Sequence, residues 1–179
     1  ASDVYKRQVL SMSKKNYSLS WDIDSFFKGG SHSAELQAKL EQTSKELAAF
    51  TTAVSEWDGQ DYTVFNELTS SYANLGMATF QMGSFVECFS AADASDTYSD
   101  TLLNRLGSLN ATLQNASNEL SKKTTLLSDE HWQQWLETDA LKEIAFVLDE
   151  LRTNQNFLLS DKEETLINNL SVDGYAGWS

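Results

Sequence analysis

Apolar residues recur at helical spacing along most of this chain. From 36 to 57 they fall three, four or seven positions apart, and from 65 to 89 they keep a seven-residue rhythm that only Thr79 interrupts. A third run, from 102 to 120, forms a narrow seam of the kind found in coiled coils. Nowhere do apolar and polar residues alternate for six positions with β-branched content, so the pattern predicts helices and no strand.

Polar capping residues divide the apolar runs into separate helices. The candidate N-caps of the three long helices are Ser31 or Ser33, Asp61, and Asp96 or Thr97. Asp58 and Gly59 end the first helix. Ser128, followed by two acidic residues that suit the positive end of a helix dipole, opens a short helix that ends near Thr138. The spacing of Leu141, Ile144, Leu148 and Leu151 predicts another helix after it.

The last stretch, 157–179, contains a helix start, a helix stop and an unfinished helix. Ser160 and Glu163 form a capping box, in which hydroxyl and carboxylate each accept a backbone amide. Leu166, Ile167 and Leu170 give this helix an apolar stripe, and Asp173 and Gly174 end it. Tyr175 and Trp178 then begin a further helix that the chain does not complete. We therefore expect a fragment, cut at the start of that helix.

Together these elements predict an all-α fold, an antiparallel bundle of about five helices truncated at the C-terminus. Met77, Phe80 and Phe85 fall off the main stripe of the second helix, which predicts that this helix lies inside the bundle. Gly76 and Gly83 lie seven positions apart on one face of it. We expect them to allow close approach of a neighbouring helix, with a functional hinge as the alternative.

The sequence predicts that the chain is divided into two segments. Residues 1–20 are interpreted as a disordered or extraneous tail, because Ala1 to Ser11 has no apolar period and Met12 is a plausible native start. Residues 21–179 form the helical region. It opens with three large aromatic residues, Trp21, Phe26 and Phe27, which we expect to dock on the helices as an extended or short turn.

Charge and cysteine content narrow the partners and the compartment. The formal net charge is −13, with 13 basic and 26 acidic residues, and such a surface repels nucleic acid and anionic membranes. A single cysteine, Cys88, cannot form an internal disulfide, which fits a reducing compartment. No apolar run is long enough to span a membrane and no signal peptide is apparent. These features predict a cytoplasmic protein with neither nucleic-acid nor membrane partners.

The residues that could carry chemistry are few. His32 and His131 are the only histidines, and neither has a second histidine four residues away. His32 with Glu35 is interpreted as a solvated pair, and His131 as half exposed in a polar turn. Cys88 is interpreted as a buried, inert thiol. We predict no catalytic, cofactor-binding or metal-ligating residue. The acidic residues on helices are interpreted as solvated faces: Glu46, Glu56, Glu67, Glu119, Glu143 and Asp149.

Three stretches resemble a known family. Leu159–Glu164, Leu170–Ser171, Gly174 and Trp178 resemble the end of the N-terminal helical region of oligoendopeptidase F, a zinc metallopeptidase of the thimet oligopeptidase type. Trp21–Phe27 resembles the family's opening segment. Ser71–Ala73 with Ala91–Asp93 resembles its second helix and exit. The chain departs from the family in having no proline, and in having Phe157 where a histidine is common.

The resemblance implies a non-catalytic N-terminal portion of a zinc-dependent oligopeptidase that hydrolyses short peptides. This portion would wall the substrate channel, with the catalytic half of the same polypeptide as its partner. The zinc and its His-Glu-x-x-His site would lie in the full-length enzyme, so this chain would be inactive alone. The alternative is a free-standing acidic helical bundle that docks a partner helix along its third helix. If the peptidase interpretation holds, some of the aromatic residues at the two ends should be exposed: Trp21, Phe26, Phe27, Tyr175 and Trp178.

Overall fold

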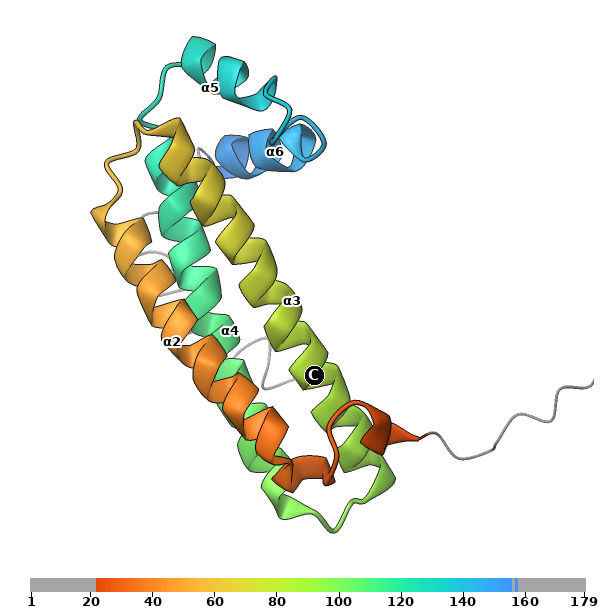
Figure 1. The fold of residues 1–179 in the computed structure, drawn as a ribbon. Coiled ribbons are helices and arrows are strands. Elements are labelled where there is room, and N and C mark those ends of the chain that lie inside the picture. The colour runs from red at the N-terminus through yellow and green to blue at the C-terminus, as the bar shows by residue number, and fades with distance from the viewer. Residues whose placement is uncertain (1–21, 156, 158–179) are drawn as a thin grey trace, which may run out of the picture.

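Three long helices form the body of the molecule. The computed structural model describes residues 22–155 and 157. The long helices are α2 (Ala34–Glu56), α3 (Tyr62–Ala92) and α4 (Thr97–Thr124). They lie side by side and alternate in direction (Figure 1). This arrangement confirms the predicted all-α, antiparallel bundle, and the described residues contain no strand. No helix among them is long and apolar enough to cross a membrane.

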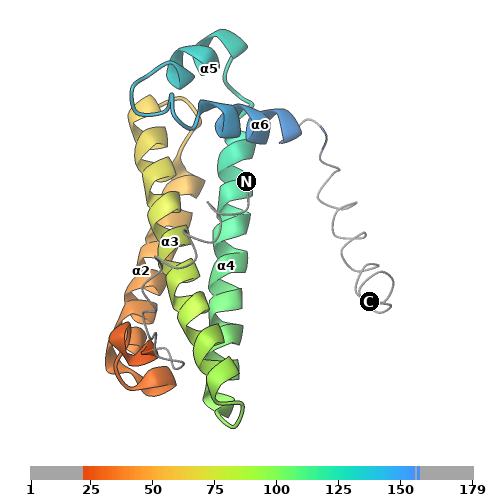
Figure 2. The same ribbon diagram turned by 90° about the vertical axis from the view of Figure 1, so that its right-hand side faces the viewer.

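Short elements close the two ends of the bundle. Two 3-10 turns, η1 (Ile23–Ser25) and η2 (Gly30–His32), lie at the end where α2 begins. At the other end, α5 (Asp129–Leu136) and α6 (Ala145–Gln155) follow α4, and α6 crosses the ends of α3 and α4 (Figure 2). The short turn at η1 is the form expected for the described part of the aromatic opening segment.

The helices begin where the sequence predicts. The side chains of Ser33, Asp61, Asp96 and Ser128 each accept a backbone amide of the first turn that follows. These bonds satisfy donors that have no partner within the helix. The α2 helix ends at Glu56, just before the predicted Asp58–Gly59 stop, and Gly59 takes the left-handed conformation with φ of +86°.

Two apolar clusters form the core, and all three long helices contribute to each. One lies toward α5 and includes Phe50, Phe65 and Trp132. The other lies toward η2 and includes Leu36 and Met82. Thr79, which interrupts the apolar rhythm of α3, is buried, and its hydroxyl donates to the Leu75 carbonyl at 3.0 Å. The polar atom is therefore satisfied inside the core.

The prediction that α3 lies inside the bundle is wrong. Of the three residues off its main stripe, Phe85 is buried, but Met77 is 58% exposed and Phe80 is 71% exposed. Three helices bury one stripe each, and no further described element covers the outer side of α3. The expected close approach at Gly76 and Gly83 is also absent, since a Cβ at either would meet nothing within 4 Å among the described residues.

A lysine on α4 closes the end of α2. The Lys123 ammonium donates to the carbonyls of Val54, Ser55 and Trp57 at 2.6 to 2.8 Å. These carbonyls lie at the C-terminal end of α2, where the helix offers no partner of its own and the dipole favours a cation. One side chain therefore ties α2 and α4 together at their shared end.

The α6 helix is anchored by one polar contact and lies partly uncovered. The buried Trp132 indole of α5 donates to Asp149 at 2.9 Å, so the interpretation of Asp149 as a solvated face is wrong. A buried indole N–H needs an acceptor, and α6 supplies it. The apolar stripe predicted here is only half covered: Leu141 is buried, while Ile144 and Leu151 are 39% and 40% exposed.

Several predictions fall on residues 1–21, 156 and 158–179, which lie outside the described residues. They are the N-terminal tail, the position of Trp21, the capping box at Ser160, the helix it begins, and the placement of Tyr175 and Trp178. They stay predictions.

Candidate functional site

The two histidines lie at opposite ends of the bundle. His32, in η2, is exposed and stacks on Tyr98 with ring centroids 4.5 Å apart. His131 is exposed in the first turn of α5, rather than half exposed in a polar turn, because Ser128 caps a helix there. In the part of the chain that the structure describes, no three or more His, Cys, Asp or Glu side chains gather in a way that could hold a metal ion.

A polar cluster joins η2 to the start of α4. Ser99, which is fully buried, donates its hydroxyl to Asp96 at 2.7 Å. Hydrogen bonds from Ser31 and then Ser99 hold the pKa of Asp96 below its ordinary value, and the Tyr98 amide and the charge of His32 act in the same direction. Each group in this cluster serves a cap or a loop contact. The arrangement is that of a structural latch.

The single cysteine is exposed, which contradicts the buried thiol expected from the sequence. Cys88 lies on α3 three residues after Phe85, at the exposed edge of the apolar stripe, and on a different side of the helix from the buried Val86. It lines an apolar groove of about 570 Å³ between the η1 segment, α2 and α3. This groove is the first candidate for a functional surface.

Aromatic rings dominate that surface, which we call the η1 groove. Phe26 and Phe27 come from the η1 segment, and Phe80 and Phe85 from α3. Phe27 packs edge to face on Phe85 with centroids 5.0 Å apart, while Phe26 and Phe80 are 75% and 71% exposed. Large aromatic side chains left in water at one place mark an interaction surface. The expectation of exposed aromatic residues at the N-terminal end is met by Phe26.

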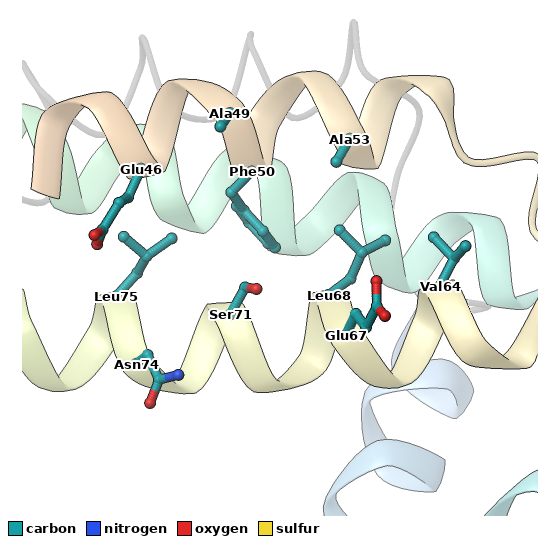
Figure 3. Close-up of a pocket in the computed structure, with 10 residues that line it drawn as sticks. All are labelled: Glu46, Ala49, Phe50, Ala53, Val64, Glu67, Leu68, Ser71, Asn74 and Leu75. Carbon is teal, nitrogen blue, oxygen red and sulfur yellow. The ribbon is translucent and has the colours of Figure 1, made fainter.

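A second groove, of about 470 Å³, lies between α2 and α3. Phe50 of α2 and Leu68 and Leu75 of α3 point toward one another on its floor (Figure 3). Glu46 and Glu67 lie on its rims and are exposed, as expected for helix faces in water. The floor residues are at most 4% exposed, so the groove is a seam of the core with little free apolar surface.

Sequence reasoning missed three residues that hold this framework: Lys123, Asp149 and Gly30. Lys123 and Asp149 resemble ordinary surface charges, and only tertiary contacts reveal their roles. Gly30 has a φ of +63°, and a Cβ there would lie 2.3 Å from the Phe89 ring. The pair Gly29–Gly30 was available as a signal, because adjacent glycines often mark a turn with positive φ.

Comparison with known proteins finds a similarity to a protein family at the C-terminal end of the chain. Residues 123–179 match the family model of the peptidase M3 N-terminal region, described as oligopeptidase F. The match covers about a third of the chain, namely the end of α4, all of α5 and α6, and the segment beyond. No curated protein and no solved structure matches the chain. The C-terminal third of this helical chain is thus similar to part of the N-terminal region of oligoendopeptidase F-like peptidases.

Proposed function

We propose that this chain is a non-catalytic N-terminal portion of a zinc-dependent oligopeptidase that hydrolyses short peptides, and that it walls one side of the substrate channel. The observation that carries the proposal is the family match over 123–179. The resemblance of Trp21–Phe27 and Ser71–Ala73 to the same family extends the argument toward the N-terminus.

The shape of the bundle suits a wall. The longest helix, α3, has 31 residues, which corresponds to about 46 Å of helix. Both apolar clusters and the Lys123 contact fix the three long helices against one another. A rigid wall of this length could admit an extended short peptide while excluding a folded protein.

The η1 groove supplies a surface for the catalytic half of the same polypeptide. Its most exposed ring, Phe26, would be covered in the complete enzyme. The groove also contains Lys39, whose ammonium donates to Gln81 at 3.4 Å at its edge. An apolar centre with a polar rim is the usual anatomy of an interface between protein parts.

Zinc does not fit the described residues. The exposed His32 and His131 lie at opposite ends of the bundle, and no cluster of metal ligands is present in the described ranges. By resemblance, the metal and the activated water belong to the remainder of the enzyme. This chain would then contribute binding geometry and no catalytic residue. We place the parent enzyme in the cytoplasm, since the one cysteine is free and the acidic charge disfavours nucleic acid and membrane surfaces.

The first test is the coding DNA past the codon for Ser179. We expect a downstream His-Glu-x-x-His motif on a helix, with a third zinc ligand beyond it. A stop codon directly after Ser179 in intact genomic DNA would overturn the peptidase proposal. It would favour the alternative, a free-standing acidic helical module that docks a partner helix.

The second test compares the chain with its parent. The chain alone should bind no stoichiometric zinc and should leave fluorogenic short peptides uncut, whereas the parent should cut them and lose activity with a chelator. In the parent, Phe26→Asp should lower kcat/KM at least several-fold by disturbing the covered surface. The matched control is Phe146→Asp, which changes an equally exposed ring, 79% exposed, outside the η1 groove. Equal effects of the two substitutions would contradict the role of the groove.

A further inference from the structure

The outer face of α3 has the form of a helix-docking surface. Ala73, Gly76, Phe80 and Gly83 recur at spacings of three, four and three, so they share one face. Ala73 is exposed, and a side chain at either glycine would meet nothing within 4 Å in the described part of the chain. Small residues on both sides of an exposed ring leave room for another helix to approach closely. Mid-helix glycine costs about 1 kcal/mol relative to alanine, and an uncovered face offers nothing to offset it.

This face continues into an apolar groove of about 180 Å³ between α3 and α4. Thr69 and Ala73 form part of the α3 wall, and Ser117 and Ser121 part of the α4 wall. The α6 helix crosses above it (Figure 2) and contributes Leu148 and the part-exposed Leu151. The groove thus lies under α6 and shares Ala73 with the outer face of α3.

We propose that residues 161–171 of this same chain form a helix that docks in the groove between α3 and α4 and completes a four-helix bundle. The connection between α6 and this segment is long enough to allow the docking. Leu151 already lines the groove and α6 ends at Gln155. The five residues 156–160 can span up to about 17 Å. A segment that runs from the α6 end toward Gly83 would lie antiparallel to α4, as neighbouring helices do in an up-and-down bundle.

The length and pattern of the segment fit the surface. Eleven helical residues extend about 16 Å, and the ten steps from Ala73 to Gly83 along α3 extend about 15 Å. Leu166, Ile167 and Leu170 supply the apolar stripe that the groove would bury. Ser160 and Glu163 cap its start.

A tethered segment is favoured over a second copy of the chain. Two copies would each carry a formal charge of −13, which opposes association. A segment joined by five residues has an effective concentration on the order of millimolar. This inference does not depend on the zinc or channel role, because the docking is internal to residues 1–179.

Hydrogen exchange of the intact chain tests the proposal. Amides of 161–171 should be protected at least about tenfold over an unstructured peptide, and Ala73→Glu should remove most of that protection. The matched control is Ala48→Glu, an exposed alanine on α2, which should leave it unchanged. Unprotected amides in the unsubstituted chain would overturn the proposal. So would protection that survives Ala73→Glu, or protection that rises with protein concentration, which would indicate a second copy.

A double-mutant cycle keeps the test decisive if a variant is less stable. Gly83→Glu and Leu170→Ala are combined, and the equilibrium constant for unfolding is measured in urea, because a segment that starts beside Ala73 places Leu170 near Gly83. If the two residues face one another, the double variant should change the constant by less than the product of the single changes, by a factor of about three or more. A double change equal to the product would contradict docking at this face.

Discussion

Gly30 shows how one residue can fix the entry of the chain into the bundle. It is buried, has a φ of +63°, and lies where a Cβ would meet the Phe89 ring at 2.3 Å. Its neighbour Gly29 has a φ of +98°, but a Cβ there would find its nearest neighbour at 3.8 Å. A side chain at Gly29 would therefore meet only the unfavourable φ, whereas a side chain at Gly30 would meet both the unfavourable φ and a steric clash.

We predict that Gly30→Ala lowers the free energy of unfolding by roughly 2–3 kcal/mol, since it adds both a strained φ and a clash. Gly29→Ala should cost only about 1 kcal/mol, for the strained φ alone. Urea unfolding followed by far-ultraviolet circular dichroism measures both. Equal losses would mean that the Phe89 ring moves aside at little cost.

Asp96 makes the stability of the η2 end depend on pH. Its pKa is lowered in the folded protein, chiefly by Ser31 and then by Ser99. A lowered folded pKa contributes stability that is fully present above the unfolded pKa, near 3.8. That contribution is lost as the pH falls through the folded pKa.

Asp96→Asn should therefore be less stable than the unsubstituted chain at pH 7, although asparagine can still cap the helix. The difference should shrink as the pH falls below about 4. Thermal unfolding from pH 7 to pH 2.5 provides the measurement. A difference that stays constant over that range would show that the carboxylate charge has no part in the latch.

At the scale of elements, α2 and α4 are joined by hydrogen bonds as well as by apolar packing. Lys123 donates to three carbonyls at the end of α2 and lies 3.4 Å from Glu119 on its own helix. Its side chain is 20% exposed. Carbonyls left without a donor in such a place are costly.

Lys123→Met keeps the aliphatic stem and removes the donor, so we predict a loss of about 1–3 kcal/mol in the free energy of unfolding. Lys142→Met is the control, because Lys142 pairs with Asp139 where both side chains are largely in water, and such pairs contribute little. Hydrogen exchange should also show faster opening of the last turn of α2. If Lys142→Met lowers the free energy of unfolding as much as Lys123→Met does, the contact of Lys123 with the α2 carbonyls is no stronger than a surface ion pair.

At the scale of the whole molecule, the formal charge of −13 opposes the compact state. Repulsion among surface carboxylates is screened by salt, and raising the salt from about 0.01 M to about 1 M shortens the Debye length from about 30 Å to about 3 Å. Salt also weakens favourable ion pairs such as Lys142 with Asp139, but exposed pairs of this kind contribute little to stability. Net stabilisation by salt follows.

We predict that sodium chloride raises Tm by a few degrees over that range. Glu41→Lys, at an exposed position, changes the formal charge from −13 to −11 and should reduce the rise. Differential scanning fluorimetry is sufficient for the comparison. A Tm that falls with salt would mean that favourable ion pairs outweigh the repulsion.

The sequence predicted the elements well, for a local reason. Caps such as Ser33 and Ser128 act on amides two or three residues away, and apolar spacing sets which face is buried. The error at α3 arose because Phe80 and Met77 are apolar, and apolar character alone does not tell a core face from a docking face. Cys88 was misplaced for the same reason, and Asp149 because its partner lies 17 residues away.

The sequence by itself determined the helical class, the positions of the caps, the acidic surface and the resemblance to the oligoendopeptidase F N-terminal region, because each depends on local pattern or composition. The tertiary structure alone decided which faces meet. It brought Lys123 to the end of α2, Asp149 to Trp132 and Gly30 against Phe89, and among residues 22–155 it placed nothing within 4 Å of a side chain at Gly76 or Gly83 on the outer face of α3. These outcomes depend on residues far apart in the chain, whose distances are set only when the helices pack.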